Sequence, residues 1–232
     1  MKGEIKIAHV HLENLLVLSD EYVQLLIVEN PNEFYTMVAA LVEQFEGKES
    51  DFSFSQNWKV IEPAKCGAIV SSPFHFDLND KKIISLLQKR LEGVAFGEKI
   101  ARFNELSAKT MEFLGELAFF VPFSLDYTEP QPIDYLKASG LKLEKSYDTL
   151  EEKIICYINV LIELKKCEFF IFVNLKGVLS DEKLLQVYEH CRREQVGLLL
   201  IENGKQRPLL SNEKAVIITE DLCEILENYQ EI

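Results

Sequence analysis

Two histidines near the N-terminus have a spacing that could bind a metal ion. Residues 4–10 alternate polar and apolar side chains, as a half-buried strand does, so His9 and His11 fall on one face of it. Imidazole nitrogens bind zinc, but a protein zinc site needs at least three ligands. No third ligand of matching spacing lies nearby in the sequence. The pattern therefore favours ordinary polar strand positions over a zinc site.

The sequence lacks the residues that phosphate-transfer chemistry usually requires. After the apolar run 24–29, residues 29–33 read Glu-Asn-Pro-Asn-Glu, whereas a phosphate loop needs glycine backbone amides and a lysine. A second apolar run, 169–173, is followed by Asn174, where a nucleotide hydrolase carries a magnesium-binding aspartate. We therefore predict that the chain does not hydrolyse nucleotides.

Nucleophilic catalysis has equally little support. Neither Cys66, Cys167 nor His75 has a partner in the sequence that would complete a catalytic pair. The cysteines are odd in number and form no C-x-x-C pair, which argues against disulfides and structural zinc. We expect reduced thiols, mostly in the core, and no enzymatic activity. The five cysteines are Cys66, Cys156, Cys167, Cys191 and Cys223.

Basic residues are concentrated in one segment of an acidic protein. The chain of 232 residues has a net charge of −13, which by itself argues against binding to phosphates. Between Lys81 and Lys109, however, seven basic residues stand against three glutamates, a local charge of +4. The candidate phosphate contacts are Lys81, Lys82, Lys89, Arg90, Lys99 and Arg102.

An acidic turn follows this segment. Asp126 and Glu129, with Asp134 beyond them, could offer oxygen ligands to calcium on irregular backbone. The turn lacks the spacing and the glycine of an EF-hand loop. From the residues alone, an ordinary solvated turn is the better interpretation.

Five continuous apolar runs predict buried parallel strands, and helical patterns separate them, so the fold class is α/β. Helix starts are indicated at Asn30, Thr149 and Ser180, and Thr219 is expected to cap the last helix. The runs are 24–29, 67–70, 169–173, 197–201 and 215–218.

Residues 79–121 contain no apolar run typical of a buried strand, and only Gly93 and Gly97 interrupt a helical pattern there. Two long helices fit best, and the second carries apolar residues close to a coiled-coil spacing, so it needs another helix to pack on. We predict an α/β head from residues 1–76 and 123–232, with an inserted α-helical leg at 77–122. No stretch approaches the ~20 apolar residues of a membrane span, and no signal peptide is evident, so we expect a cytoplasmic protein.

An ordered series of motifs resembles a known family. Residues 150–166 give a long helix that ends in two lysines, and the strand 169–174 ends in Phe-Val-Asn. Residues 179–182 then read Leu-Ser-Asp-Glu, and the runs 25–29 and 198–202 fall in matching order. This series is similar to the accessory proteins of type II-A CRISPR systems that act in spacer acquisition.

The resemblance implies a head like a degenerate phosphate-loop nucleotide-binding fold and a homotetrameric ring around double-stranded DNA. Such a ring engages linear DNA from free ends and needs calcium for its assembly. The family's calcium region matches Asp126 and Glu129, although Thr128 stands where related chains carry an acid. The implied partners are the spacer integrase and the RNA-guided nuclease of the same system. The alternative is a protein–protein scaffold that does not touch DNA.

Overall fold

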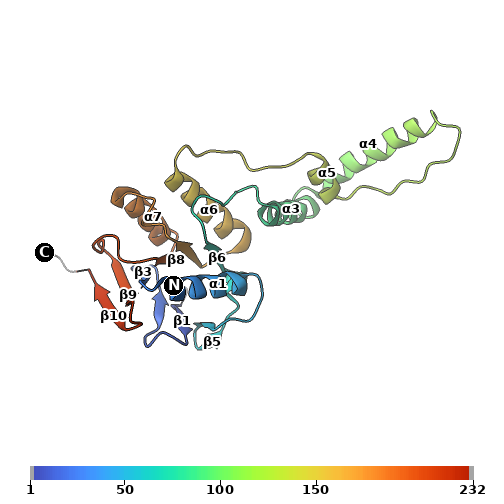
Figure 1. Cartoon of the computed structure of the whole chain (residues 1–232). Helices are drawn as coiled ribbons and strands as arrows, with labels where there is room; N and C mark the ends of the chain where they lie inside the picture. Colours follow the sequence, from blue (N-terminus) through green and yellow to red (C-terminus); the bar gives the residue numbers. More distant parts are fainter. Residues whose placement is uncertain (1–2, 230–232) are drawn as a thin grey trace. The chain divides into compact units, whose positions relative to one another are not determined.

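The computed structural model describes residues 3–229, and the chain forms two units (Figure 1). The α/β unit comprises the chain up to Asp77 and from Ser146 onward, and the helical unit spans Leu78–Lys145. The helical unit therefore includes residues 123–145, which the sequence analysis assigned to the head. The reason is the short helix α5 (Pro132–Ala138), which packs against the first helix of the helical unit.

A six-stranded sheet in the order β10-β9-β3-β8-β7-β6 is the centre of the α/β unit. All pairings are parallel except that of β10 with β9. The five predicted buried strands are confirmed, and so is the α/β fold class with a mostly parallel sheet. The strands are β3 (Val23–Val28), β6 (Gly67–Val70), β7 (Phe169–Val173), β8 (Gly197–Glu202), β9 (Glu213–Ile218) and β10 (Glu224–Asn228).

A separate four-stranded antiparallel sheet has the order β2-β1-β4-β5. The predicted N-terminal strand is its β1, and the other three strands were not anticipated. Strands β2 and β5 span only three and two residues, whereas β4 is as long as β1 and its alternation of Phe and Ser was not interpreted as a strand. Apolar side chains of this sheet join one face of the six-stranded sheet in a single core. The strands are β1 (Ile5–His9), β2 (Leu16–Leu18), β4 (Phe52–Gln56) and β5 (Lys59–Val60).

Helix α1 lies on the side of the large sheet that bears the small sheet, and α6 and α7 lie on the other (Figure 1). Met37 and Leu41 of α1 are fully buried in the shared core. The predicted caps Asn30, Thr149 and Ser180 are confirmed at the starts of α1, α6 and α7. The helices of this unit are α1 (Pro31–Phe45), α2 (Pro63–Cys66), α6 (Leu150–Lys165) and α7 (Asp181–Arg193).

The prediction of a C-terminal helix after Thr219 is wrong, because residues 224–228 form strand β10. Thr219 instead stabilises a tight turn between β9 and β10, in which its hydroxyl accepts a hydrogen bond from Cys223 N at 3.1 Å. Leu222 adopts a left-handed conformation with φ of 63°, which reverses the chain direction. The apolar residues that suggested a helix therefore lie in an edge strand paired with β9.

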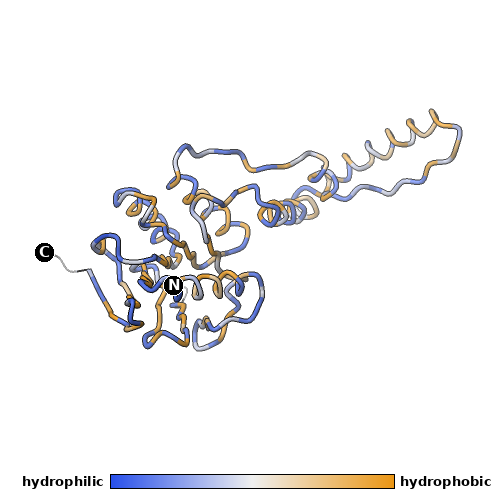
Figure 2. The backbone as a smooth tube through the Cα atoms, in the orientation of Figure 1, coloured by the Kyte–Doolittle hydropathy of each residue, from blue (hydrophilic) through white to orange (hydrophobic). Residues whose placement is uncertain are grey.

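The helical unit contains the two predicted long helices, α3 (Lys81–Phe96) and α4 (Ile100–Ala118), broken at Gly97, together with α5. Helix α3 packs against α4 and α5, and Phe103 of α4 contacts Tyr135 of α5 edge to face. Figure 2 shows apolar and polar residues alternating along α4. Within residues 3–229, none of the helices has the length and apolarity to cross a membrane.

Candidate nucleic-acid interface and metal sites

Four of the predicted phosphate contacts lie on one side of α3. Lys82 and Lys89 are about 20° apart around the helix axis, and Lys81 and Arg90 lie to either side of them within about half of the circumference. All four are exposed, while Ile83 is buried. We call these four exposed cations, Lys81, Lys82, Lys89 and Arg90, the α3 basic face.

The start of this face is shaped by an acidic cap. Asp80 accepts a hydrogen bond from Lys82 N at 2.7 Å, as an N-cap residue does. The cap places one carboxylate beside the first two lysines. At the other end of this face, Glu92 follows Lys89 by three residues and places a second carboxylate beside the basic residues.

The two other predicted contacts belong to α4. Lys99 is the N-cap residue, and Arg102 lies in the first turn; both are exposed. Arg102 Nη1 is 4.0 Å from Glu105 Oε2, and Lys109 Nζ is 2.8 Å from Glu105 Oε1. Because Glu105 offsets part of this charge, α4 contributes less positive potential than α3 does.

The predicted calcium ligands lie between α4 and α5 on irregular, exposed chain. The carboxylate of Glu129 accepts a hydrogen bond from Ser107 Oγ at 2.6 Å, and Ser107 is fully buried. Asp134 is used elsewhere, since it accepts from Gln131 N and caps α5. A calcium ion held by Asp126 and Glu129 would need further oxygen ligands from backbone carbonyls, water or another copy of the chain.

The junction of β3 and α1 is closed by the chain's own atoms. Asn30 Oδ1 accepts hydrogen bonds from Asn32 N at 3.0 Å and Glu33 N at 3.1 Å. These helix N-terminal amides are the groups that would bind an anion. At the end of β7, Asn174 Oδ1 similarly accepts from Asn203 N. Both asparagines thus have local structural roles, which agrees with the absence of a phosphate loop.

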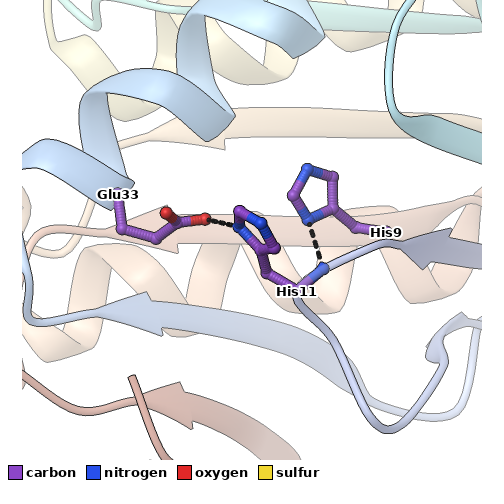
Figure 3. Close-up of side chains that lie close together, drawn as sticks. All are labelled: His9, His11 and Glu33. Atoms are coloured by element: carbon purple, nitrogen blue, oxygen red, sulfur yellow. Dashed lines mark hydrogen bonds and ion pairs between the residues drawn. The ribbon is translucent and has the colours of Figure 1, made fainter. Parts of the chain in front are cut away.

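The structure brings a third potential ligand to the two N-terminal histidines. His11 Nδ1 lies 2.6 Å from Glu33 Oε1, and His11 N donates to His9 Nδ1 at 3.2 Å (Figure 3). Burial lowers the pKa of His9, and the adjacent His11 lowers it further. Among residues 3–229, these three form the single cluster of His, Cys, Asp or Glu side chains compact enough to hold a metal. Glu33 was not predicted as a ligand because it follows His11 by 22 residues.

A buried charge network was also missed. Lys176 Nζ contacts both carboxylate oxygens of Glu213 at 2.6 and 2.7 Å, and Tyr188 donates to Glu213 Oε1 at 2.7 Å. Burial and the charge of Glu213 raise the pKa of Tyr188. Burial also raises the pKa of Glu202 to about 7. Lys176 follows β7, Tyr188 lies in α7 and Glu213 begins β9. Because these residues are far apart in the sequence and show no regular spacing, only the three-dimensional structure reveals that they interact.

The cysteines and one pocket are further features that could take part in chemistry. Two of the five cysteines, Cys167 and Cys191, are buried, fewer than expected. Burial raises the pKa of Cys191 to about 12 and also raises that of Cys66, so both thiols stay protonated near neutral pH. A pocket of about 180 Å³, lined by Tyr22 and Arg192 among others, is smaller than the ~300–1,000 Å³ of typical small-molecule sites.

Comparisons with solved structures return ATP-binding cassettes of ABC transporters. A nucleotide-free cassette is 12% identical, covers 95% of this chain and 88% of its own length, and has a TM-score of 0.47. A second cassette is 13% identical, with coverages of 94% and 88% and the same TM-score of 0.47. Because both scores are below 0.5, the fold class rests on the strand order and pairing described above.

Comparisons of sequence give a narrower result. A CRISPR-associated protein Csn2 of Streptococcus agalactiae is 25% identical over 201 residues, which cover 85% of this chain and 89% of the relative. A CRISPR-associated protein Csn2 of Enterococcus faecalis is 23% identical over 178 residues, covering 72% and 77%. A family profile described as CRISPR-associated protein (Cas_Csn2) matches residues 44–222. This chain therefore belongs to the Csn2 family of CRISPR-associated proteins, as the ordered motifs indicated.

Proposed function

We propose that this protein is a non-catalytic, sequence-independent double-stranded DNA-binding ring that acts in the capture of new CRISPR spacers. The observation that carries the proposal is the α3 basic face, a cluster of exposed cations in a chain of net charge −13. Lysine and arginine on one helix face neutralise phosphates without reading bases, so the binding would be strong but independent of sequence.

Self-association supplies the ring. Large apolar side chains are exposed along and just beyond α4, and exposed apolar side chains gathered on one element are typical of a protein interface. A closed symmetric tetramer would cover these residues and gather four basic faces around one opening. The exposed residues are Ile100, Leu106, Phe113, Leu117, Phe119, Phe120 and Phe123.

The topology of the DNA tests the proposal. A ring that loads over free ends should shift a linear duplex on a gel but not a closed circle of the same sequence. Cutting the circle once should restore binding, with no change in base composition. Equal binding to the closed and the cut circle would contradict a ring that loads from ends.

Calcium is proposed as the ion that holds the assembly, with Asp126 and Glu129 as ligands. Two carboxylates that approach without a cation repel each other, so removal of calcium should loosen the tetramer. Size-exclusion profiles should shift to smaller species with a chelator, and Asp126→Ala with Glu129→Ala should give that profile even in calcium. Superimposable profiles with calcium and chelator would contradict the assignment.

A protein–protein scaffold is the second candidate, because the same apolar residues of α4 could contact the spacer integrase or the RNA-guided nuclease of the system. Leu106 is 48% exposed and Phe113 57% exposed. Leu106→Glu with Phe113→Glu distinguishes the two functions. The ring proposal predicts loss of the tetramer and of DNA binding together, whereas a scaffold predicts a stable tetramer that no longer captures its partner. Both functions place the protein in the cytoplasm with the CRISPR machinery.

A further inference from the structure

Three side chains from distant parts of the sequence converge at one edge of the α/β unit. His9 ends β1, His11 lies in the turn that follows, and Glu33 lies in the first turn of α1. Each offers one ligand atom, and these atoms lie within 4.8 Å of one another. Figure 3 shows the His11 ring between the other two side chains. The cluster therefore links the small sheet to the helix that follows β3.

The donor set suits a divalent transition metal. Two imidazole nitrogens and one carboxylate oxygen are a frequent set of protein ligands for zinc. Bonds of about 2.1 Å in a tetrahedral site place ligand atoms about 3.4 Å apart. The spread of 4.8 Å exceeds this distance by an amount that small side-chain rotations can supply. Calcium, by contrast, prefers a set made wholly of oxygen.

Neighbouring groups hold two of the ligands in place before any metal arrives. The His9 ring packs on the Phe52 ring with centroids 4.2 Å apart and is only 7% exposed. Glu33 is fixed in the first turn of α1, whose amides are capped by Asn30. A preorganised site of this kind loses little side-chain entropy when a metal binds.

We propose that His9, His11 and Glu33 bind one divalent transition-metal ion of the zinc class. The ion replaces the direct contact of 2.6 Å between His11 Nδ1 and Glu33 Oε1 with two metal–ligand bonds. The His11 side chain is 54% exposed, so a fourth position remains open to water, as in zinc sites with three protein ligands. This site is chemically distinct from the calcium ligands proposed at Asp126 and Glu129.

Bound metal would join β1 to α1 and so stabilise the α/β unit. A ligand that binds the folded state alone raises the unfolding temperature in proportion to the logarithm of its concentration. We expect the unfolding temperature of the full-length protein to rise with zinc while calcium is held in excess. Calcium in excess saturates oxygen-rich sites and leaves the histidine site for zinc.

Histidine-specific NMR reads the site directly, because the chain contains only four histidines. With ¹⁵N-histidine labelling, zinc should shift the ring signals of His9 and His11 at one equivalent per chain. The signals of His75 and His190 should stay in place, since neither belongs to the cluster. Unmoved His9 and His11 signals, or equal shifts for all four histidines, would overturn the proposal.

Matched variants give the second readout. His11→Gln and Glu33→Gln keep the size of the side chains, and each should weaken zinc binding by at least about tenfold, as loss of even an outer-shell partner does. His75→Gln is the control on an exposed histidine hydrogen-bonded to Ser72, and Cys223→Ser removes the one exposed thiol. Unchanged zinc affinity in both ligand variants would sink the assignment, and circular dichroism verifies that each variant is folded.

Discussion

One ion pair from each unit of this protein shows two different uses of charge. In the α/β unit, Lys176 and Glu213 form an ion pair whose side chains are 5% and 0% exposed. In the helical unit, Glu105 pairs with Lys109 while their side chains are 53% and 68% exposed. A buried pair constrains the fold because either partner alone would be an uncompensated charge. Exposed charges contribute little to stability and remain available to a binding partner.

The burial of apolar side chains also differs between the core of the α/β unit and the helical unit. The core of the α/β unit covers both faces of its large sheet, since Phe169 and Phe170, whose side chains point to opposite faces, are both fully buried. The helical unit leaves Phe113 and Phe120 at 57% and 85% exposed. The core around the large sheet is therefore completed by the chain itself, whereas the exposed phenylalanines of the helical unit suit a further partner.

Charge reversal on the α3 basic face should have the largest effect. Replacing Lys81, Lys82, Lys89 and Arg90 with glutamate should abolish DNA binding without unfolding, since exposed charges each contribute little stability. If each of four subunits supplies about two or three phosphate contacts, wild-type log affinity should fall with log salt at a slope of roughly −7 to −11. Fluorescence anisotropy across a salt series measures this slope. A folded variant with an unchanged slope would place the DNA surface elsewhere.

Breaking the buried pair should be the next largest effect. Lys176→Met leaves Glu213 buried without its cation, so the free energy of unfolding should fall by about 3–5 kcal/mol. Urea denaturation followed by circular dichroism measures the loss. The double variant with Glu213→Gln is the control, because it removes the unpaired charge and should recover part of the stability. A loss below about 1 kcal/mol would show that the pair is less buried in solution than its geometry implies.

Glu202 makes the stability of the α/β unit depend on pH. Burial raises its pKa from 4.5 to about 7, and its Oε2 atom is buried without a hydrogen-bond partner. The folded state therefore binds the proton more tightly than the unfolded state. The contribution of Glu202 to the free energy of unfolding is fully present below pH 4.5. About 3 kcal/mol of it is lost as the pH rises toward 7, because the carboxyl must then ionise in a buried position.

The variant Glu202→Gln, which has nearly the same shape, isolates the contribution of Glu202 ionisation to stability. Glu202→Gln cannot ionise, so the difference in unfolding free energy between variant and wild type should grow between pH 4.5 and 7 and then level off. Urea titrations at several pH values measure that difference. A difference that stays constant with pH would mean that Glu202 is solvated in the folded state.

The smallest effect is expected on the exposed pair. Glu105→Gln removes the carboxylate that contacts Arg102 and Lys109, and the unfolding free energy should change by less than about 0.5 kcal/mol. DNA affinity should rise slightly, because both cations lose their competing anion. A stability loss comparable to that of Lys176→Met would erase the distinction between the units.

Much of the fold was predictable because its signals are local. A continuous apolar run such as residues 169–173 predicts a strand covered on both faces. Caps such as Thr149, which closes a capping box with Glu152, predict where helices begin. The same logic failed at Thr219, where the side chain caps a turn. The Thr219 hydroxyl accepts a hydrogen bond from Cys223 N in this turn, just as an N-cap hydroxyl accepts one from a backbone N–H in the first turn of a helix. The residue type therefore does not distinguish a turn from a helix start.

The sequence alone determined the strand runs, the caps, the missing phosphate loop and the concentration of basic residues in α3, because each depends on neighbours along the chain. Only the tertiary structure decided that Glu33 lies against His11, that Lys176 pairs with Glu213, and that residues 123–145 join the helical unit. These pairings join residues that no periodicity relates. They exist because sheets and helices pack distant segments together to bury apolar surface, and the polar groups carried along must then satisfy one another.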